Sequence, residues 1–307
     1  MGGIQENKEH LRQINRVIDY IQGHLDRPLG VSELAGLAHV SPYHFHRIFT
    51  REVGESLAKY VLRRRLERAA SLLSSEADTP LADIAYGCGF NTQSVFSRNF
   101  KRHFLVTPTQ YRQQKRNSKK SQIVPKNRPV ARSYSHYFCP RKTIINEDKT
   151  MDCTFEIKKL ESFPIAYCRH RGPFDRMQDA FSKLMQWAAP RGLLAVSGMK
   201  LLSVYHDDPD VTEPGLLTAD AAMTVPEGTP AGGEIGRYEV SGGLYAVGRF
   251  EVAMEDFPAA WRAMFDLIRE YGCRCAEGHH YEVYLNDRET HPQRKWFIDI
   301  CIPVELL

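Results

Sequence analysis

The sequence predicts two domains: an all-α domain with two helix-turn-helix units over residues 8–116, and an α+β domain of two βαββ repeats over residues 151–307. Three observations support this division. The N-terminal half contains an internal repeat of about 50 residues, and the C-terminal half contains one of about 80 residues. The two halves also differ in charge, with 17 Lys and Arg against 11 Asp and Glu over residues 1–116, and 16 against 24 over residues 151–307.

Length and composition are those of an ordinary soluble protein. The 307 residues suffice for two separate cores, and 42% hydrophobic with 25% charged residues is typical of globular chains. Because the sequence has neither an apolar run of about 18 residues nor a secretory signal, we expect a cytoplasmic location and no membrane partner. The seven cysteines should then be reduced. Cys273 and Cys275 are close together, but the sequence has no second Cys/His pair at the spacing of zinc ligands. We expect no metal and no cofactor.

The first helix-turn-helix unit follows a covering helix. Apolar residues recur at helical spacing over 11–21 and predict that helix. Leu34 lies on the apolar stripe of the next helix, where the small Ala35 allows close approach of its partner. Ser41 is placed to cap the second helix of the unit, with Pro42 at its first position.

The second unit repeats the first. Ala85 follows Ala35 by 50 residues, whereas Arg98 follows Arg47 by 51, so the second turn holds one extra residue. Between the two copies, residues 56–74 have apolar side chains at helical spacing and predict one long connecting helix. This helix would fix the separation of the two units.

Residues 117–150 are predicted to be an exposed basic linker. They contain three prolines, 8 Lys and Arg against 2 Asp and Glu, and no sustained period of 3.6 or 2. Such a segment can add nonspecific attraction to phosphates. A short strand or helix inside it is an open alternative.

The second helix of each unit presents a polar face that lacks acidic residues. Asp and Glu are absent from residues 41–50 and 91–104, although a solvated face usually mixes both signs. A helix that enters the major groove of DNA needs Arg, Gln, Ser or His and must keep carboxylates away from phosphates. The alternative is a plain helical bundle with a duplicated hairpin. Nothing in such a bundle would keep Asp and Glu off the exposed face of these helices. The sequence therefore favours DNA binding.

Several motifs occur together in this half: Leu34-Ala35, Ser41-Pro-Tyr-His-Phe-His-Arg-Ile-Phe49, Ile84-Ala85, Gly89-Phe90, Ser94, Phe96, Arg98, Phe100-Lys101 and Thr107-Pro108-Thr-Gln-Tyr111-Arg112. In this combination the segment resembles the AraC/XylS family of transcription regulators, most closely its MarA and Rob branch, over about 105 residues. Leu105 departs from the family, which usually has Gly there.

The resemblance implies base contacts from both recognition helices, namely from Tyr43, His46, Arg47, Gln93, Ser94, Ser97 and Arg98. Arg47 and Arg98 suit guanine, and Gln93 suits adenine. Phosphate contacts are expected from Lys101, Arg102 and Arg112. The expected partners are double-stranded DNA, a small-molecule effector and RNA polymerase.

The C-terminal repeat has a constant offset. Val204–Asp208 matches Val283–Asp287, and Asp220–Val225 matches Asp299–Val304, both 79 residues apart. Each repeat is predicted to form strand, helix, strand, strand. The strands are expected near 165–170, 200–206 and 217–225, then 244–250, 279–286 and 296–304, with helices near 173–189 and 255–271.

Two βαββ units side by side form a sheet whose helices cover one face, so the other face is expected to line a cleft. Alternation along the strand is expected to point Tyr281 towards the helices, and Glu282 and Tyr284 into the cleft. At the same offset, Tyr205 matches Tyr284 and Ser203 matches Glu282, which leaves one unmatched carboxylate. A carboxylate beside aromatic rings suits a cationic, apolar ligand. Alternatively, Glu282 is an exposed strand residue or pairs with a basic side chain.

A second group of motifs lies in this half: Ala166-Tyr167, Arg169-His170, Gly172-Pro173-Phe174, Tyr281-Glu282-Val-Tyr284-Leu285 and Asp299-Ile-Cys-Ile-Pro-Val304. They resemble the GyrI-like small-molecule-binding domain over nearly all of residues 153–305, although Glu289–Trp296 departs from its usual pattern. The resemblance implies that Glu282 lies in a ligand pocket for an amphiphilic or cationic effector. The expected ligand-binding residues are Glu282, Tyr284, Tyr205, Tyr167 and Trp261.

Three functions follow as hypotheses. The first is a DNA-binding regulator whose C-terminal domain senses a small molecule. The second keeps DNA binding but makes the C-terminal domain a protein-docking module. The third is a hydrolase of reactive compounds that uses Glu282 to activate water, beside Tyr284 and either Trp187 or Trp261. Because the sequence has no evident nucleophile–base pair, phosphate loop or metal cluster, we expect a regulator rather than an enzyme.

Overall fold

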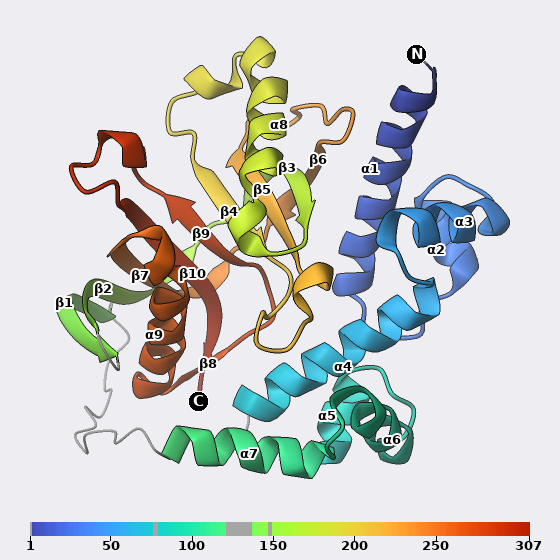
Figure 1. Cartoon of the computed structure of the whole chain (residues 1–307), viewed down its shortest axis with the longest axis horizontal. Helices are drawn as coiled ribbons and strands as arrows, with labels where there is room; N and C mark the ends of the chain where they lie inside the picture. The colour runs from blue at the N-terminus through green and yellow to red at the C-terminus, as the bar shows by residue number, and fades with distance from the viewer. Residues whose placement is uncertain (1, 76–78, 121–136, 147–148) are drawn as a thin grey trace. The chain divides into compact units, whose positions relative to one another are not determined.

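The structure is a computed structural model of the chain that describes residues 2–75, 79–120, 137–146 and 149–307, with side chains over 8–74, 79–116 and 153–307. It divides into two compact units (Figure 1). The first comprises residues 1–125 with two short loop segments, 208–213 and 232–236, and the second comprises the rest.

The first unit is helical, as predicted. Its helices are α1 (Gly2–Gln22), α2 (Val31–Leu37), α3 (Pro42–Val53), α4 (Leu57–Ser75), α5 (Leu81–Gly87), α6 (Gln93–Phe104) and α7 (Pro108–Lys120). Helix α4 is the predicted connecting helix and runs between the pairs α2/α3 and α5/α6 (Figure 1). Leu57 and Tyr60 at its start pack into the core of the first pair, whereas Leu66, Ala69 and Leu73 pack into the core of the second. One helix therefore ties the two helix-turn-helix units together.

The two turns have the same backbone hydrogen bonds, which confirms the repeat. Val40 N donates to Ala35 O at 3.1 Å, and Phe90 N donates to Ala85 O at 3.0 Å. The side chains of Ala35 and Ala85 are both buried, so the small residues lie where the helices of each pair approach closely.

Each turn contains one residue in the left-handed region. In the first turn this is His39, with φ of 54°, and in the second it is Gly89, with φ of 75°. Glycine is required in the second turn for a further reason, because a Cβ atom at position 89 would lie 2.2 Å from the carbonyl oxygen of Leu25. The backbone of the second turn thus packs directly against the segment that follows α1.

The second unit contains an antiparallel sheet with two helices longer than one turn, α8 (Gln178–Ala188) and α9 (Phe257–Glu270). The strands described are β1 (Tyr137–Asn146), β2 (Lys149–Leu160), β3 (Phe163–Arg171), β4 (Leu201–Tyr205), β5 (Thr218–Thr224), β6 (Gly236–Val240), β7 (Gly243–Val252), β8 (Cys273–Cys275), β9 (His280–Tyr284) and β10 (Trp296–Leu306). Their order is β1-β2-β7-β10-β9-β4-β5-β3-β6, with β8 paired to β10.

The strand order confirms the two βαββ repeats. The first repeat is β3-α8-β4-β5 and the second is β7-α9-β9-β10, and they meet where β4 pairs with β9 at the centre of the sheet. Strands β1, β2 and β6 extend this arrangement at its two edges. The predicted linker range 117–150 contains the end of α7, all of β1 and the start of β2, while 121–136 and 147–148 lie outside the described residues.

The sheet is buried on both faces, and this corrects the predicted orientation of β9. Glu282 lies opposite Ile300 of β10, on the face that packs against α9. Tyr281 and Val283 lie on the other face, in a second core with Tyr245 of β7. Alternation along β9 correctly assigned Glu282 and Tyr281 to opposite faces of the sheet. It could not show which of these faces packs against the helices, because both faces are apolar.

One cross-strand ion pair occurs in both repeats with very different burial. Arg169 of β3 pairs with Asp220 of β5 at 2.8 Å, and their side chains are 1% and 0% exposed. Its counterpart joins Arg249 of β7 to Asp299 of β10 at 2.7 Å, with 56% of the arginine side chain exposed. The buried pair also involves His206, whose Nε2 lies 2.7 Å from an Asp220 carboxylate oxygen.

Candidate functional site

Helix α3 has one buried face and one exposed polar face. Ser41 begins it, since its Oγ accepts a hydrogen bond from the backbone N of His44 at 3.3 Å, and Pro42 occupies the first position as predicted. Phe45, Ile48 and Phe49 are the buried residues of the helix. The predicted base-contacting residues Tyr43, His46 and Arg47 are all exposed, and Tyr43 is 76% exposed. A tyrosine so accessible on a firmly anchored helix is available to a partner.

Helix α6 repeats this arrangement. Thr92 caps it by accepting a hydrogen bond from the backbone N of Val95 at 3.2 Å, and Phe96 and Phe100 are buried. Of the predicted base-contacting residues, Gln93, Ser94 and Arg98 are exposed and Ser97 is half-buried.

The predicted phosphate-contacting residues divide into two groups. Lys101 and Arg102 are exposed in the last turn of α6. Arg112 of α7 is half-buried instead, and its Nη2 donates to the carbonyl oxygen of Thr79 at 2.7 Å. Arg112 therefore holds α7 to the segment before α5, a role that the sequence pattern did not reveal.

In the second unit, Glu282 is completely buried and accepts three hydrogen bonds. Tyr205 and Tyr284 donate through their hydroxyls to Oε1 at 2.8 and 2.7 Å, and Trp261 donates through Nε1 to Oε2 at 3.0 Å. Since Tyr284 gives its proton to Glu282, it accepts one from Ser203 Oγ at 2.8 Å. Four of the five predicted ligand-binding residues are therefore brought together by β4, β9 and α9.

Burial is the largest influence on this carboxyl. It raises the pKa of Glu282 above the ordinary 4.5, while the hydrogen bonds from Tyr284, Trp261 and Tyr205 act in the opposite direction. Burial, followed by the nearby charge of Glu282, raises the pKa values of both Tyr205 and Tyr284 well above 10.0. The tyrosines therefore stay protonated and remain hydrogen-bond donors at neutral pH.

Half-buried aromatic rings form a frame around Glu282. The edge of Phe174 packs on Tyr205, whose ring packs in turn on Trp261, with ring centroids 4.8 and 5.2 Å apart. On the other side, Phe181 of α8 and Trp296 of β10 pack on Tyr284 at 5.8 and 5.0 Å. None of these rings is fully buried. An ionised carboxylate inside a partly exposed aromatic frame can attract a cation over the ring faces.

Tyr167, the fifth predicted ligand-binding residue, lies apart from this cluster. It lies on β3 opposite Ala222, on the face of the sheet that carries Tyr281 rather than Glu282, and packs on the ring of Tyr238 at 4.9 Å. Conversely, the sequence prediction omitted Phe174, Phe181 and Trp296. Sequence features could have pointed to them: Phe174 belongs to the Gly-Pro-Phe motif, Phe181 lies in the predicted helix near 173–189, and Trp296 ends the unusual segment Glu289–Trp296.

Comparison with known proteins matches each unit separately. A helix-turn-helix domain family matches residues 34–114, and the GyrI-like small molecule binding domain family matches residues 154–305.

Individual relatives follow the same division. The probable transcriptional regulator LumQ of Photobacterium leiognathi is 35% identical over 107 residues, which cover 34% of this chain and 43% of LumQ. The transcriptional regulator Rob of Salmonella typhimurium is 36% identical over 99 residues, 32% of this chain and 34% of Rob. A DNA gyrase inhibitor of Edwardsiella ictaluri is 33% identical over 154 residues, 48% of this chain and 96% of the inhibitor.

The two matches define a protein with an N-terminal helix-turn-helix unit and a C-terminal unit of the gyrase-inhibitor type. The chain belongs to the AraC-type helix-turn-helix proteins that carry a GyrI-like domain. It spans less than half the length of the helix-turn-helix relatives that it matches.

Two further observations concern the described residues alone. None of their helices combines the length and the apolar character needed to cross a membrane. The six cysteines whose side chains are described form no disulfide with one another, and no three His, Cys, Asp or Glu side chains in the described part of the chain gather as a metal site.

Proposed function

We propose that this protein is a transcription regulator that binds double-stranded DNA through α3 and α6 and responds to a small cationic or amphiphilic effector held at Glu282. The observation that carries the DNA-binding part is the duplicated, acid-free face of the two helices, with Arg47 and Arg98 exposed at equivalent positions. Two such helices on one unit are suited to adjacent major-groove segments on one side of the duplex.

Direct readout follows from the chemistry of these side chains. Arg47 and Arg98 suit the O6 and N7 atoms of guanine, Gln93 suits adenine, and Lys101 with Arg102 suits phosphates. The test is selection of binding sites from a random DNA pool by the full chain, followed by footprinting. Protection of two segments about one helical turn apart would support the proposal, and binding without sequence preference would refute it.

The effector part rests on Glu282. When Glu282 is ionised, its carboxylate is bonded by three neutral donors, so a cation placed over the rings of Tyr205, Tyr284 or Trp261 gains both charge and cation–π attraction. Calorimetry of the full chain with octyltrimethylammonium, repeated on Glu282→Gln, tests it. Binding that is lost in the variant supports the site, and equal binding by both proteins refutes it.

A second candidate function for the C-terminal unit is protein docking, which the similarity to a DNA gyrase inhibitor favours. The name of that relative describes an action on another protein. Supercoiling assays with purified gyrase distinguish the two candidates, because inhibition by this chain that persists in Glu282→Gln would indicate docking without an effector. RNA polymerase is the further partner that we propose for the DNA-bound protein.

We also propose that the protein binds its effector without chemical turnover. A general base must reach water, and the Glu282 carboxylate is completely buried with three of its four lone-pair sites already occupied by hydrogen bonds from Tyr205, Tyr284 and Trp261. Turnover of an electrophilic ester that disappears in Glu282→Gln would overturn this.

A further inference from the structure

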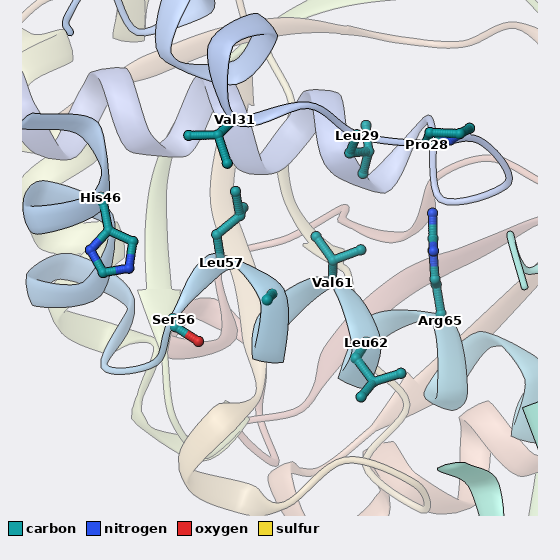
Figure 2. Close-up of a pocket in the computed structure, with 10 residues that line it drawn as sticks. Pro28, Leu29, Val31, His46, Ser56, Leu57, Val61, Leu62 and Arg65 are labelled. Atoms are coloured by element: carbon teal, nitrogen blue, oxygen red, sulfur yellow. The ribbon is translucent and has the colours of Figure 1, made fainter. Parts of the chain in front are cut away.

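A cavity of about 420 Å³ lies in the helix-turn-helix unit and has no part in the proposed effector site (Figure 2). Its apolar walls come from Leu29 just before α2, from Val31 at the start of α2, and from Val61 and Leu62 on α4. Small-molecule sites are mostly apolar cavities of about 300–1,000 Å³ with a few polar groups. This cavity has both properties.

Three polar residues line the cavity, and two of them, His46 and Arg65, are basic. His46 of α3 and Arg65 of α4 stand at opposite ends in Figure 2, with Leu57 and Val61 between them. None of the ten lining residues is acidic. The lining therefore complements a negatively charged group attached to an apolar body.

Arg65 differs from its neighbours on α4 because, among the described residues, no carboxylate lies within ion-pair distance of its guanidinium. Arg63 pairs with Glu55 at 2.7 Å and Arg64 pairs with Glu67 at 3.1 Å. The Arg65 guanidinium instead donates to two backbone carbonyls, to Leu25 O at 2.9 Å and Arg27 O at 2.7 Å. Burial lowers the pKa of Arg65 below the ordinary 12.5, and the nearby Cys88 and Asp26 oppose this shift without outweighing it.

Arg65 also lies where the two helix-turn-helix units meet. Its guanidinium carbon is 2.8 Å from the position that a Cβ atom at Gly89 would occupy, so Arg65 packs against the turn between α5 and α6. The same guanidinium also donates a hydrogen bond to the segment before α2. His46, at the other end of the cavity, is one of the proposed base-contacting residues. A molecule in this cavity would touch both the junction and the recognition helix α3.

We propose that this cavity is a second ligand site, for an amphiphilic anion whose sulfonate or carboxylate binds Arg65 and whose apolar part lies along α4 towards His46. Because such a ligand shares His46 with DNA, occupation of the cavity weakens DNA binding, and DNA weakens ligand binding by the same factor. The site is independent of Glu282 and selects the opposite charge.

Octanesulfonate and octyltrimethylammonium test the proposal on the full chain, since they share a tail and differ in charge. We expect octanesulfonate to bind, Arg65→Met to weaken it roughly tenfold or more through loss of charge-assisted hydrogen bonds, and Glu282→Gln to leave it unchanged. Ala58→Trp provides a second variant, because Ala58 lines the cavity from an exposed position and tryptophan there fills it without disturbing a buried core.

Lys59→Met is the matched control, since it removes a positive charge from an exposed position of the same helix that does not line the cavity. Binding of octanesulfonate that is equal in the wild type, Arg65→Met and Ala58→Trp would overturn the proposal, as would no binding at millimolar concentration. Loss in Glu282→Gln would place the anion in the other unit and overturn it as well.

Discussion

Ser203 and Glu282 lie directly opposite each other on β4 and β9, at the seam where the two βαββ repeats meet. They are also equivalent residues of the two repeats, 79 positions apart. On either side, Tyr205 pairs with His280 and Leu201 pairs with Tyr284. The pseudo-twofold axis of the sheet therefore passes between the serine and the glutamate, and the repeats differ in charge at the point where they coincide.

Cation binding at this seam should weaken in acid. The pKa of Glu282 lies above 4.5 because of burial, so protonation on acidification begins at a higher pH than for an exposed glutamate. We expect the affinity for octyltrimethylammonium to fall as the pH drops through that raised pKa, with a midpoint above 4.5. Titration calorimetry between pH 4 and 8 measures it. An affinity independent of pH across this range would contradict a role for the carboxylate.

Arg47→Ala and Lys101→Ala should affect DNA binding differently. A base-contacting arginine contributes roughly 1–3 kcal/mol of discrimination at one base pair, whereas a phosphate-contacting lysine contributes on any sequence. We expect Arg47→Ala to relax specificity at one position, and Lys101→Ala to weaken specific and random DNA alike with a smaller salt dependence. Competition gel shifts over a series of salt concentrations measure both the sequence specificity and the salt dependence of the affinity. If Arg47→Ala lost the same affinity for specific and for random DNA, Arg47 would not be a base-contacting residue.

The buried and exposed copies of the cross-strand ion pair should differ in their contribution to stability. Asp220→Asn leaves Arg169 buried without its charge partner and should cost about 3–5 kcal/mol. Asp299→Asn, at the equivalent position, should cost about 0–1 kcal/mol because Arg249 is mostly solvated. Urea unfolding of the two variants compares them, and equal losses would refute the distinction.

The Asp220 carboxylate should also make the stability of the protein depend on pH in the acidic range. Burial alone would raise the pKa of Asp220, but the charges of Arg169 and His206 and their hydrogen bonds outweigh it and hold that pKa well below the ordinary 3.8. A lowered pKa stabilises the fold above 3.8, and this contribution is lost as the pH falls below it. Asp220→Asn should therefore flatten the acid limb of a plot of unfolding free energy against pH.

Leu105 ends α6 in a conformation that suits glycine. Its φ is 62° and its side chain is 83% exposed, so it bears the strain of the left-handed region and gains little burial. Leu105→Gly should raise the free energy of unfolding by about 0.5–1 kcal/mol, the difference between relieved strain and the greater freedom of glycine in the unfolded chain. Leu105→Ala is the control, because it keeps the Cβ atom and should give no such gain.

Two glycines with similar backbone angles should respond very differently to alanine. Gly54 has φ of 82° and nothing within 4 Å of an added Cβ, so Gly54→Ala should cost only about 1–2 kcal/mol of conformational strain. At Gly89, with φ of 75°, the added atom also meets the Leu25 carbonyl and Arg65. We expect Gly89→Ala to cost at least about 2 kcal/mol more than Gly54→Ala in thermal unfolding.

Much of the fold follows from local signals and from the repeats. Ser41 with Pro42 marks the start of α3, and the 79-residue offset locates strands in both halves of the sheet. Strands β1, β2, β6 and β8 were not predicted, since none of them belongs to the duplicated pattern from which the others were inferred. Thr79, which receives the Arg112 hydrogen bond, is 33 residues away from it, so no local spacing could reveal that contact.

The composition of the candidate ligand site was predicted better than its orientation. Glu282, Tyr205 and Tyr284 emerged from alternation and repeat matching, and the structure brings them into contact. The wrong assignment of the sheet face arose because both faces are apolar. Only the packing of α9 through Trp261 determines which face holds the carboxylate.

The position of Glu282 on the pseudo-twofold axis restricts how this charge can have arisen. Two identical βαββ units joined across the same seam would place the same side chain on both sides, either two hydroxyls or two carboxylates. Two carboxylates so close together cannot both ionise, and they would share a proton. A single carboxylate at the centre of the sheet therefore requires the two units to differ at this position, which their fusion in one chain allows.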